Sequence, residues 1–498
     1  MQVTFDYADV DSYRQFLRIK GLPVYRIEGR TVWVPDEYAH LLDATAAAPR
    51  TVDYLPSPFL FDYQAGVSRL AVRKRKFAVF MACGLGKTLI LLDYARHVAG
   101  VLPGQRVLIV SPLMVVPQTL AECVRFYGGS LLVEHVAPRD LQRWIDAPGG
   151  GVGITNYEAI RDRLTAGRLG CLILDESSLL KSHYGAWGQR LIRLGAGLEY
   201  KLCLTGTPAP NDRIEYANHA VFLDQFPTVN AFLARYFVNR GQTGERWELK
   251  PHALRPFYRS LSHWCIFVEN PSTYGWRDNT DAIPPIHVHI HDVDLTDEQA
   301  AEVSRVSGTL IGVPGGITSR GKLAQLAKGR ANGRDVATNK PAFIRELVET
   351  WPDEQTLIWC RYNHEQDLLE REFSQAASIR GETPHNKRQQ LIEAFQRGGQ
   401  RVMISKPKVL GFGLNLQVAT RQVFNGLWDS YEETYQAIKR SNRIGSTRPL
   451  NVHIPVTSIE RAMVDTVLAK AKRVQADTEE QERIFSQAAV MPMEDRNN

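Results

Sequence analysis

The chain has 498 residues, which is too long for one ordinary hydrophobic core, and a prior of about 150 residues per domain predicts roughly three folded units. Hydrophobic residues make up 44% and charged residues 23%, a balance that excludes a largely disordered chain. The formal net charge of +6 is compatible with a polyanionic partner, but it is too mild to indicate one by itself.

Neither a membrane segment nor a secretory signal is predicted. No stretch approaches the roughly 18 apolar residues of a membrane-spanning helix, and the opening MQVTFDYADVDSY lacks the basic and apolar regions of a signal peptide. The six cysteines are scattered without the paired spacing of a zinc site, so we expect them to be reduced. These features favour a cytoplasmic protein that has no membrane partner.

The first 50 residues are predicted to form a small α+β appendage. A helix in the segment YRQFLRIK is followed by a hairpin that turns at Glu28 and Gly29. This appendage is either a substrate-recognition module or a part that packs against the lobe that follows it.

A glutamine lies at the start of the next predicted helix, in the segment FDYQ (61–64). Its amide group is able to read the N6 and N7 edge of an adenine base with two hydrogen bonds. Gln64 precedes Lys87 by 23 residues, so it is a candidate selector of ATP over GTP if the loop around Lys87 binds a nucleotide. A solvent-facing glutamine on a helix is the alternative.

A glycine-rich loop then joins a predicted strand to a predicted helix. The run KFAVF (76–80) is typical of a short buried strand, and TLILLDYARHV (88–98) is typical of a helix with an apolar face. Backbone N–H groups at the start of a helix attract an anion, so the loop between them predicts a phosphate site. The loop consists of Gly84, Leu85, Gly86, Lys87 and Thr88.

The last two residues of this loop indicate a nucleoside triphosphate. Lys87 is expected to reach the β and γ phosphates, and the Thr88 hydroxyl is expected to coordinate Mg²⁺. Met81 stands where the general phosphate-loop pattern has its first glycine. A loop that is only a structural turn is therefore the alternative.

Three further strands are predicted in the same lobe. The segments that begin VLIVSP (107–112) and GVGITN (151–156) are apolar, rich in β-branched residues, and stop at polar residues, as parallel strands do where their end loops face a ligand. The third strand, KLCLT (201–205), breaks into the turn Gly206, Thr207 and Pro208. We expect this turn to couple to the γ phosphate.

An acidic pair follows another apolar strand, CLIL (171–174). Asp175 and Glu176 then lie at the carboxyl edge of a parallel sheet, where α/β proteins bind ligands. Asp175 is expected to hold Mg²⁺, and Glu176 is expected to orient and polarise the attacking water. The alternative is a helix N-cap followed by an acid that the helix dipole stabilises.

Residues 211–339 show no strand alternation of this kind. They contain aromatic-rich helices such as EYANHAVFLDQF (215–226) and then the basic stretch SRGKLAQLAKGRANGRD (319–335). The arginine and lysine side chains of that stretch either bind nucleic-acid phosphates or form a solvated helix face.

Residues 340–460 repeat the α/β alternation of the first lobe. The segments TLIWCR, RVMIS, QVFNGLW and NVHIPVT are strand-like, and KPAFIRELVETW and HNKRQQLIEAFQRG are helical. The predicted fold is therefore α/β, with two lobes built on parallel sheets, a helical insert between them and the small α+β appendage. The predicted domains are residues 1–50, 51–210, 211–339, 340–460 and 461–498.

The order of these motifs resembles the superfamily 2 helicase-like ATPases, and within them the Swi/Snf translocases of double-stranded DNA. The matching segments are FDYQ, GLGKT, LIVSPLMVVPQ, TNYE, DESSLLK, LTGTPAPN, QTLIWCRY, SKPKVLGFGLNLQVA, YQAIKRSNRIG and TSIERAMVDTVLAKAKR. They span residues 60–470. The resemblance implies two RecA-like lobes, with ATP and duplex DNA bound across the cleft between them.

The resemblance also assigns residues of the second lobe. Gln436, Arg440 and Arg443 are implied to face the nucleotide, where a guanidinium stabilises the charge of the transferring γ phosphoryl group once the cleft closes. A basic helix end that contacts its own carbonyls is the alternative. In the loop GFGLNLQ (411–417), Gly413 allows close approach of the backbone to ATP or to DNA phosphates.

The chain also departs from the family pattern at several positions. Met81 and Ala82 replace an acidic pair before the loop glycines, DESS replaces DEAH, Ser446 stands where glutamine is expected, and Trp428 is not followed by Asn-Pro. None of these changes removes a phosphate or metal ligand, so activity is still expected. We expect these changes to affect the rate of the activity and the choice of partner.

The expected function is an ATPase that uses ATP and Mg²⁺ and moves along double-stranded DNA, displacing or remodelling bound protein, as a monomer when free. One alternative is a strand-separating or annealing helicase of the same superfamily. Another is a DNA-binding scaffold that uses ATP as a latch and turns it over slowly. Since no chromatin-reader module or long accessory tail is evident, a bacterial, archaeal or viral source is favoured over a eukaryotic one.

Overall fold

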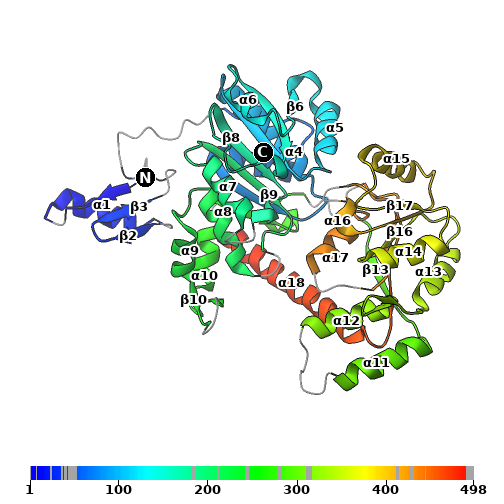
Figure 1. Cartoon of the computed structure of the whole chain (residues 1–498). Coiled ribbons are helices and arrows are strands. Elements are labelled where there is room, and N and C mark those ends of the chain that lie inside the picture. The colour runs from blue at the N-terminus through cyan, green and yellow to red at the C-terminus, as the bar shows by residue number, and fades with distance from the viewer. Residues whose placement is uncertain are drawn as a thin grey trace. The chain divides into compact units, whose positions relative to one another are not determined.

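The computed structural model divides the chain into two compact units (Figure 1). The first unit comprises Met1–Asp278 together with Thr478–Asn498, and the second comprises Asn279–Asp477. The structure describes residues 2–6, 8–22, 25–34, 38, 42, 53–180, 185–209, 212–241, 246–277, 283–309, 317–410, 414–426, 431–443 and 445–488.

A seven-stranded parallel sheet forms the centre of the first unit. Its strand order is β12-β4-β9-β8-β5-β7-β6. Each strand is an apolar run, and β8 (Leu169–Asp175) is buried along its whole length, as expected for a parallel strand covered on both faces. The other strands are β4 (Lys76–Met81), β5 (Arg106–Ser111), β6 (Val133–His135), β7 (Gly151–Asn156), β9 (Tyr200–Thr205) and β12 (Cys265–Val268).

Helices flank this sheet (Figure 1). The helix that follows the glycine-rich loop, α4 (Lys87–Val101), has seven buried residues, which explains why its sequence carries an almost continuous apolar run. The other helices of this unit are α3 (Asp62–Lys74), α5 (Val116–Tyr127), α6 (Leu141–Asp146), α7 (Ala186–Leu194), α8 (Tyr216–Phe222), α9 (Val229–Tyr236) and α10 (Leu254–Leu261). A short hairpin, β10 (Phe237–Asn239) and β11 (Trp247–Leu249), follows α9.

The second unit has a six-stranded parallel sheet of order β13-β20-β19-β16-β18-β17. Its strands are β13 (Ile286–Asp292), β16 (Thr356–Trp359), β17 (Ala377–Ile379), β18 (Val402–Ser405), β19 (Arg421–Phe424) and β20 (Leu450–Val456). Its helices are α11 (Asp297–Thr309), α12 (Ile317–Ala327), α13 (Lys340–Glu349), α14 (Asn363–Glu372), α15 (His385–Gln396), α16 (Pro407–Leu410) and α17 (Tyr431–Ile438). The small hairpin β14 (Arg330–Ala331) and β15 (Arg334–Asp335) follows α12. The predicted α/β class with two parallel sheets is thus confirmed.

The last helix, α18 (Arg461–Ala488), carries residues of both units. Its end belongs to the first unit, where Glu482 Oε1 accepts hydrogen bonds from the backbone N–H groups of Glu269 and Asn270, directly after β12. Phe485 packs edge-on against Phe267 of that strand. None of the described helices is long and apolar enough to cross a membrane.

The N-terminal appendage has the predicted helix and hairpin. Helix α1 (Val10–Lys20) precedes β2 (Arg26–Glu28) and β3 (Thr31–Trp33), which turn at Gly29 with φ +57°. A further strand, β1 (Gln2–Thr4), pairs with β3 on its other side. The appendage has a small core of its own, which includes Phe5, Ile19, Val32, Val34, Tyr38 and Leu42.

Residues 211–339, predicted as a helical insert without the strand alternation of the lobes, contribute strands to both sheets. β12 lies beside β4 at one edge of the first sheet, and β13 lies beside β20 at one edge of the second. The helices predicted in this stretch are present as α8, α9 and α10, while the basic stretch 319–335 supplies part of α12 and the β14–β15 hairpin. Each sheet therefore draws an edge strand from the predicted insert.

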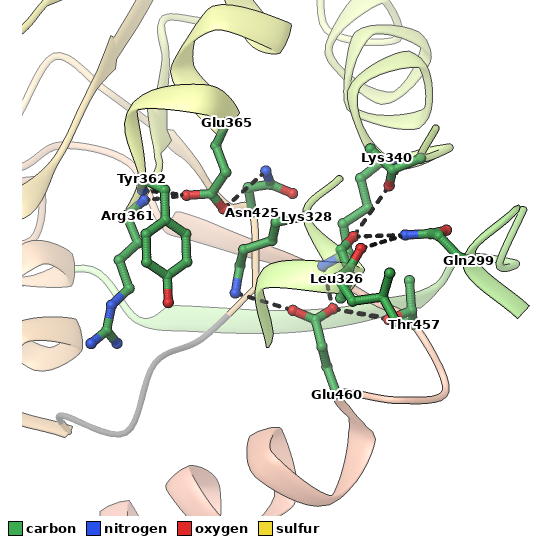
Figure 2. Close-up of polar contacts among 12 residues, drawn as sticks. Gln299, Leu326, Lys328, Lys340, Arg361, Tyr362, Glu365, Asn425, Thr457 and Glu460 are labelled. Carbon is green, nitrogen blue, oxygen red and sulfur yellow. Dashed lines mark hydrogen bonds and ion pairs between the residues drawn. The ribbon is translucent and has the colours of Figure 1, made fainter. Parts of the chain in front are cut away.

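The carboxyl edge of the second sheet is filled by a buried ionic cluster (Figure 2). Glu460, fully buried before α18, pairs with Lys328 at 3.2 Å and also with Lys340. The Thr457 hydroxyl donates to the same carboxylate at 3.1 Å. Burial raises the pKa of Glu460, but the charges of Lys340 and Lys328 outweigh it and hold that pKa below its usual range. The lowered pKa favours the ionised form of the Glu460 carboxylate.

A second buried carboxylate completes this edge (Figure 2). Glu365 accepts hydrogen bonds from the backbone N–H groups of Arg361 and Tyr362, after β16, and from the Asn425 amide at 3.3 Å, after β19. Every cluster member has its partners inside the second unit. The edge is thus closed by buried polar groups that pair with one another, while Lys328 Nζ and Asn425 Oδ1 have no hydrogen-bond partner among the described residues.

Candidate nucleotide site

The glycine-rich loop adopts the backbone that only glycine takes readily. Gly84 has φ +97° and Gly86 has φ +75°, and Gly86 forms the N-cap of α4 in the left-handed conformation. A Cβ atom added to Gly86 would collide with the Gln64 amide nitrogen. The loop is therefore shaped both by its own glycines and by the helix that precedes it.

Gln64 is buried, with 2% of its surface exposed, so the solvent-facing alternative is wrong. Its amide nitrogen donates to the Leu85 carbonyl at 3.0 Å, and its amide oxygen accepts from the Phe61 N–H at 3.0 Å. The neighbouring Tyr63 hydroxyl also donates to the Leu85 carbonyl at 3.0 Å. Gln64 thus supports the phosphate loop, and its part in reading adenine stays a prediction.

Lys87 begins α4 and turns back over the loop. Its ammonium group donates to the carbonyls of Met81 at 2.9 Å and Ala82 at 3.3 Å. Both carbonyls belong to the end of β4 and the residue after it, where Ala82 N–H donates to Val268 O of β12. The next residue, Thr88, is partly exposed in the first turn of the helix. Lys87 and Thr88 therefore lie at the carboxyl edge of the sheet, as predicted.

The predicted acidic pair lies at the same edge. Asp175 is the last residue of β8 and is 6% exposed. Its carboxylate accepts from the Ser111 hydroxyl at 2.8 Å and from the Glu176 N–H at 3.1 Å. Burial, followed by the negative charge of Glu176, raises the pKa of Asp175 to about 7.

Glu176 has an unusual backbone conformation. Its φ of +50° is in the left-handed region, which costs a residue with a Cβ atom roughly 1–3 kcal/mol. Its carboxylate lies 3.4 Å from the Thr205 hydroxyl, which in turn accepts from the Thr207 N–H at 3.2 Å. The turn after β9 is thus linked to Glu176 by hydrogen bonds, as its predicted coupling role requires.

The donor set fits Mg²⁺ bound together with phosphate oxygens. No ion pair joins Asp175 or Glu176 to any residue that the structure describes. Within the same described part of the chain, no group of three His, Cys, Asp or Glu side chains is arranged to hold a metal ion. Mg²⁺ is usually bound by one or two carboxylates, substrate phosphates and water, so Asp175 and Thr88 suffice if a nucleotide is present.

Two residues of this site had no predicted role. Ser111 ends β5 and contacts the Asp175 carboxylate, while Tyr157, just after β7, donates from its hydroxyl to the Asp175 carbonyl at 2.6 Å. Both lie in segments that were expected to face a ligand, LIVSP and TNYE. The sequence signal for them was therefore the polar residue at the end of a buried strand.

The predicted residues of the second unit lie after β19. Gln436 is in α17 and is partly exposed, as is Arg443 beyond the end of that helix. The Arg443 side chain donates from Nε to the Lys439 carbonyl at 2.8 Å. Gly413 lies outside the described residues. The roles of these residues towards a nucleotide stay predictions.

Arg440 is 2% exposed and contacts its own lobe. It donates to the Pro407 carbonyl at 3.0 Å, and its guanidinium lies over the Trp359 ring, 5.3 Å from the ring centroid. Its backbone carbonyl accepts from the Leu416 N–H. These contacts give Arg440 a packing role within the second unit, whatever its role towards a ligand.

Comparison with known protein families finds a match in the second lobe. The model of the helicase conserved C-terminal domain matches residues 339–445. The mouse protein "DNA annealing helicase and endonuclease ZRANB3" is 24% identical over 331 residues, which cover 61% of this chain and 29% of that protein. YwqA of Bacillus subtilis (strain 168), whose name includes the words helicase/translocase, is 24% identical over 427 residues, covering 78% of this chain and 45% of YwqA.

One solved structure matches nearly the whole length of this chain. The SWI2/SNF2 ATPase core of Sulfolobus solfataricus in complex with dsDNA has 20% sequence identity and a TM-score of 0.41, and the match covers 90% of this chain and 98% of that one. The chain spans less than half the length of ZRANB3 and of YwqA. The activities of those whole proteins therefore cannot be assigned to this chain from these matches.

Proposed function

We propose that this chain, a Swi/Snf-like helicase of superfamily 2, hydrolyses ATP and uses the energy to move along double-stranded DNA. The observation that carries the proposal is the convergence at one sheet edge of Lys87, Asp175 and Glu176, three residue types with separate tasks in phosphoryl transfer. The names of the relatives, which include helicase and translocase, support the motor part of the proposal.

Binding would place the triphosphate against the N-terminus of α4. The loop backbone and the helix dipole attract the phosphates, and Lys87 exchanges its contacts with Met81 and Ala82 for the β and γ phosphates. Thr88 and Asp175 would hold Mg²⁺, which would supply positive charge to neutralise the phosphates. Because Gln64 is bonded to Leu85 within the loop, a nucleotide that shifts the loop also shifts α3.

In the hydrolysis step, Glu176 orients a water molecule in line with the γ phosphorus and accepts a proton from it. A bond forms between the water oxygen and phosphorus, and the bond from phosphorus to the oxygen of ADP breaks, with its electron pair left on ADP. The products are ADP, phosphate and the proton, which returns to solvent from the carboxylate. Because the Thr205 hydroxyl lies 3.4 Å from the same carboxylate, protonation of Glu176 would alter this contact and so affect the turn after β9.

A second candidate function is strand annealing or separation. It is favoured by the name of the mouse relative, a DNA annealing helicase. The two candidates share the ATP site and differ in what happens to the DNA, so the site does not decide between them.

The two functions are separated by a pair of displacement assays. We expect the protein with ATP to displace a third strand from a DNA triplex, since a translocase clears what lies on the duplex, and to leave a forked duplex paired. The second function would be favoured if the protein left the triplex intact and instead separated the forked duplex. Re-annealing of the strands of a DNA bubble would favour it in the same way. Glu176→Gln serves as the control, because it should be inactive in every assay.

A further inference from the structure

Tyr157 reaches across one strand to contact the backbone at the acidic pair. The strand order β8-β5-β7 places β5 between the strand that Tyr157 follows and the strand that ends at Asp175. The Tyr157 hydroxyl nevertheless donates to the Asp175 carbonyl at 2.6 Å, and the residue is 2% exposed. Asn156 fixes the turn that carries Tyr157, because its side chain accepts from the Ala159 N–H at 3.0 Å.

Ser111 contacts the side chain of the same residue. It ends β5, whose Val110 pairs with Leu174, so Ser111 lies beside Asp175 in the sheet register. The Ser111 hydroxyl donates to Asp175 Oδ2 at 2.8 Å, and Ser111 is fully buried. Ser111, at the end of the neighbouring strand β5, thus hydrogen-bonds the Asp175 carboxylate, and Tyr157, after the next strand β7, hydrogen-bonds the Asp175 carbonyl.

The peptide that accepts the Tyr157 hydrogen bond directly precedes Glu176, a residue with a strained backbone. The Asp175 carbonyl is part of the peptide bond to Glu176, whose φ of +50° costs roughly 1–3 kcal/mol. The orientation of that peptide also lets the Glu176 N–H donate to Asp175 Oδ1. A hydrogen bond to a carbonyl resists rotation of its peptide plane, so the Tyr157 hydroxyl opposes relaxation of Glu176 out of the left-handed region.

We propose that Tyr157 and Ser111 are positioning residues for ATP hydrolysis, Tyr157 by fixing the peptide that aims Glu176 at the attacking water and Ser111 by fixing the Asp175 carboxylate for Mg²⁺. The inference rests on the proposed function. It adds to that function a division of labour, since one residue acts on the carboxylate that orients water and the other on the carboxylate that holds the metal.

The two roles predict different kinetic defects. Tyr157→Phe should lower kcat at saturating ATP and Mg²⁺ by roughly 10- to 100-fold and leave the KM for ATP unchanged, because only the aim of Glu176 is lost. Ser111→Ala should raise the Mg²⁺ concentration for half-maximal turnover by roughly 10-fold, and excess Mg²⁺ should restore its kcat.

The chain offers a matched control for each variant. The Tyr94 hydroxyl also donates to a backbone carbonyl, that of Arg75, but this carbonyl precedes β4 at the opposite edge of the same sheet. The Thr155 hydroxyl in β7 donates to the Val136 carbonyl at 2.8 Å. Tyr94→Phe and Thr155→Val should therefore keep both kcat and the Mg²⁺ dependence of the unaltered protein.

A crystal structure of Tyr157→Phe gives a readout that does not depend on turnover. The inference predicts that Glu176 leaves the left-handed region once the phenol oxygen is gone. A Glu176 φ that stays near +50° would overturn it, and so would a Tyr157→Phe enzyme with the kcat of Tyr94→Phe. An unaltered protein without ATP turnover would contradict the proposed function instead, and the crystal structure would still decide the positioning role.

Discussion

The carboxyl edges of the two parallel sheets are built from similar residue types and are used differently. In the first unit, the acids Asp175 and Glu176 have hydroxyl and backbone donors, while Lys87 donates to loop carbonyls. In the second unit, Glu460 is paired with two buried lysines, Lys328 and Lys340 (Figure 2). One edge keeps its charges apart, and the other pairs them.

The difference shows in the protonation behaviour of the acids. The pKa of Asp175 is raised to about 7, first by burial and then by Glu176, whereas that of Glu460 is lowered by its lysines despite its burial. A buried carboxylate without a cation is costly, and binding of a metal ion removes that cost. Charge pairing thus distinguishes the edge that closes the second lobe from the edge that we propose binds a nucleotide.

The largest effect is expected from changes to the separated charges. Lys87→Ala and Glu176→Gln should each lower ATP turnover by roughly 100- to 1,000-fold, because each removes a group that acts on charge developing at the γ phosphate. Both variants should keep DNA binding and the thermal unfolding temperature. A Lys87→Ala protein that unfolds well below the unaltered one would contradict the view that this edge is kept for a ligand.

The paired charges should show the opposite pattern when changed. Glu460→Gln leaves Lys328 and Lys340 buried without their counter-charge, so we expect the free energy of unfolding to fall by about 3–5 kcal/mol in urea denaturation. Glu349, which pairs with Arg345 on the surface of α13, provides the control.

Loss of that exposed pair in Glu349→Gln should cost less than about 1 kcal/mol. Equal stabilities for the Glu460→Gln and Glu349→Gln proteins would mean that the buried cluster does not hold the second lobe together. Replacement of both lysines by methionine along with Glu460→Gln should recover part of the loss, because no lysine is then buried without its partner, although Glu365 remains as a buried carboxylate.

A smaller effect is expected at the phosphate loop backbone. Gly86→Ala places a Cβ atom at φ +75° and against the Gln64 amide, so we expect weaker binding of ATP in a titration followed by calorimetry. Gly104 has φ +91° but no atom near an added Cβ, so Gly104→Ala isolates the backbone cost. Similar ATP affinities in the two variants would show that the contact with Gln64 does not matter.

The smallest effect is a pH dependence that both units share. Burial lowers the pKa of His219 to about 4, and burial together with His289 and His291 lowers that of His453 to about 3. Their pKa values in the unfolded chain are about 6.5, so the stability that these neutral side chains contribute is complete above pH 6.5 and is lost as the pH falls towards 4.

Urea denaturation at pH 7.5 and pH 5.5 measures this loss. Asp175 and Glu482 act in the opposite direction, because the pKa of each is raised to about 7 and each adds stability as the pH falls. The histidine contribution is therefore measured by comparison: His219→Asn and His453→Asn should each raise the midpoint at pH 5.5 relative to that at pH 7.5, compared with the unaltered protein. If the difference between the two midpoints were the same in both variants as in the unaltered protein, neither histidine would resist protonation.

Much of the first lobe could be predicted because its signals are local. Buried parallel strands are short apolar runs, and the residues that matter stand at their ends, as Lys87 and Asp175 do. The edge strand β13 was missed for a physical reason. β13 has the sequence IHVHIHD and is largely exposed, since a strand at the edge of a sheet needs no continuous apolar run.

The remaining parts of the two edges depend on contacts that no local pattern records. Lys340 and Glu460 are 120 positions apart in the sequence, and each looks like an ordinary surface residue. Gln64 could be placed at the start of a helix, but its hydrogen bond to the Leu85 carbonyl depends on how the loop folds back over that helix. The φ of +50° at Glu176 likewise has no signal in DESS.

The most direct test of the central claim is ATP turnover by the purified protein alone, with single-stranded DNA and with duplex DNA, each at low and moderate salt. The account predicts strong stimulation by duplex DNA, weaker stimulation by single strands, and a loss of stimulation as salt rises. In Arg443→Ala the turnover without DNA should persist and the stimulation should vanish. Stimulation by single strands alone, or by neither DNA, would contradict the proposal that this chain is a duplex DNA motor.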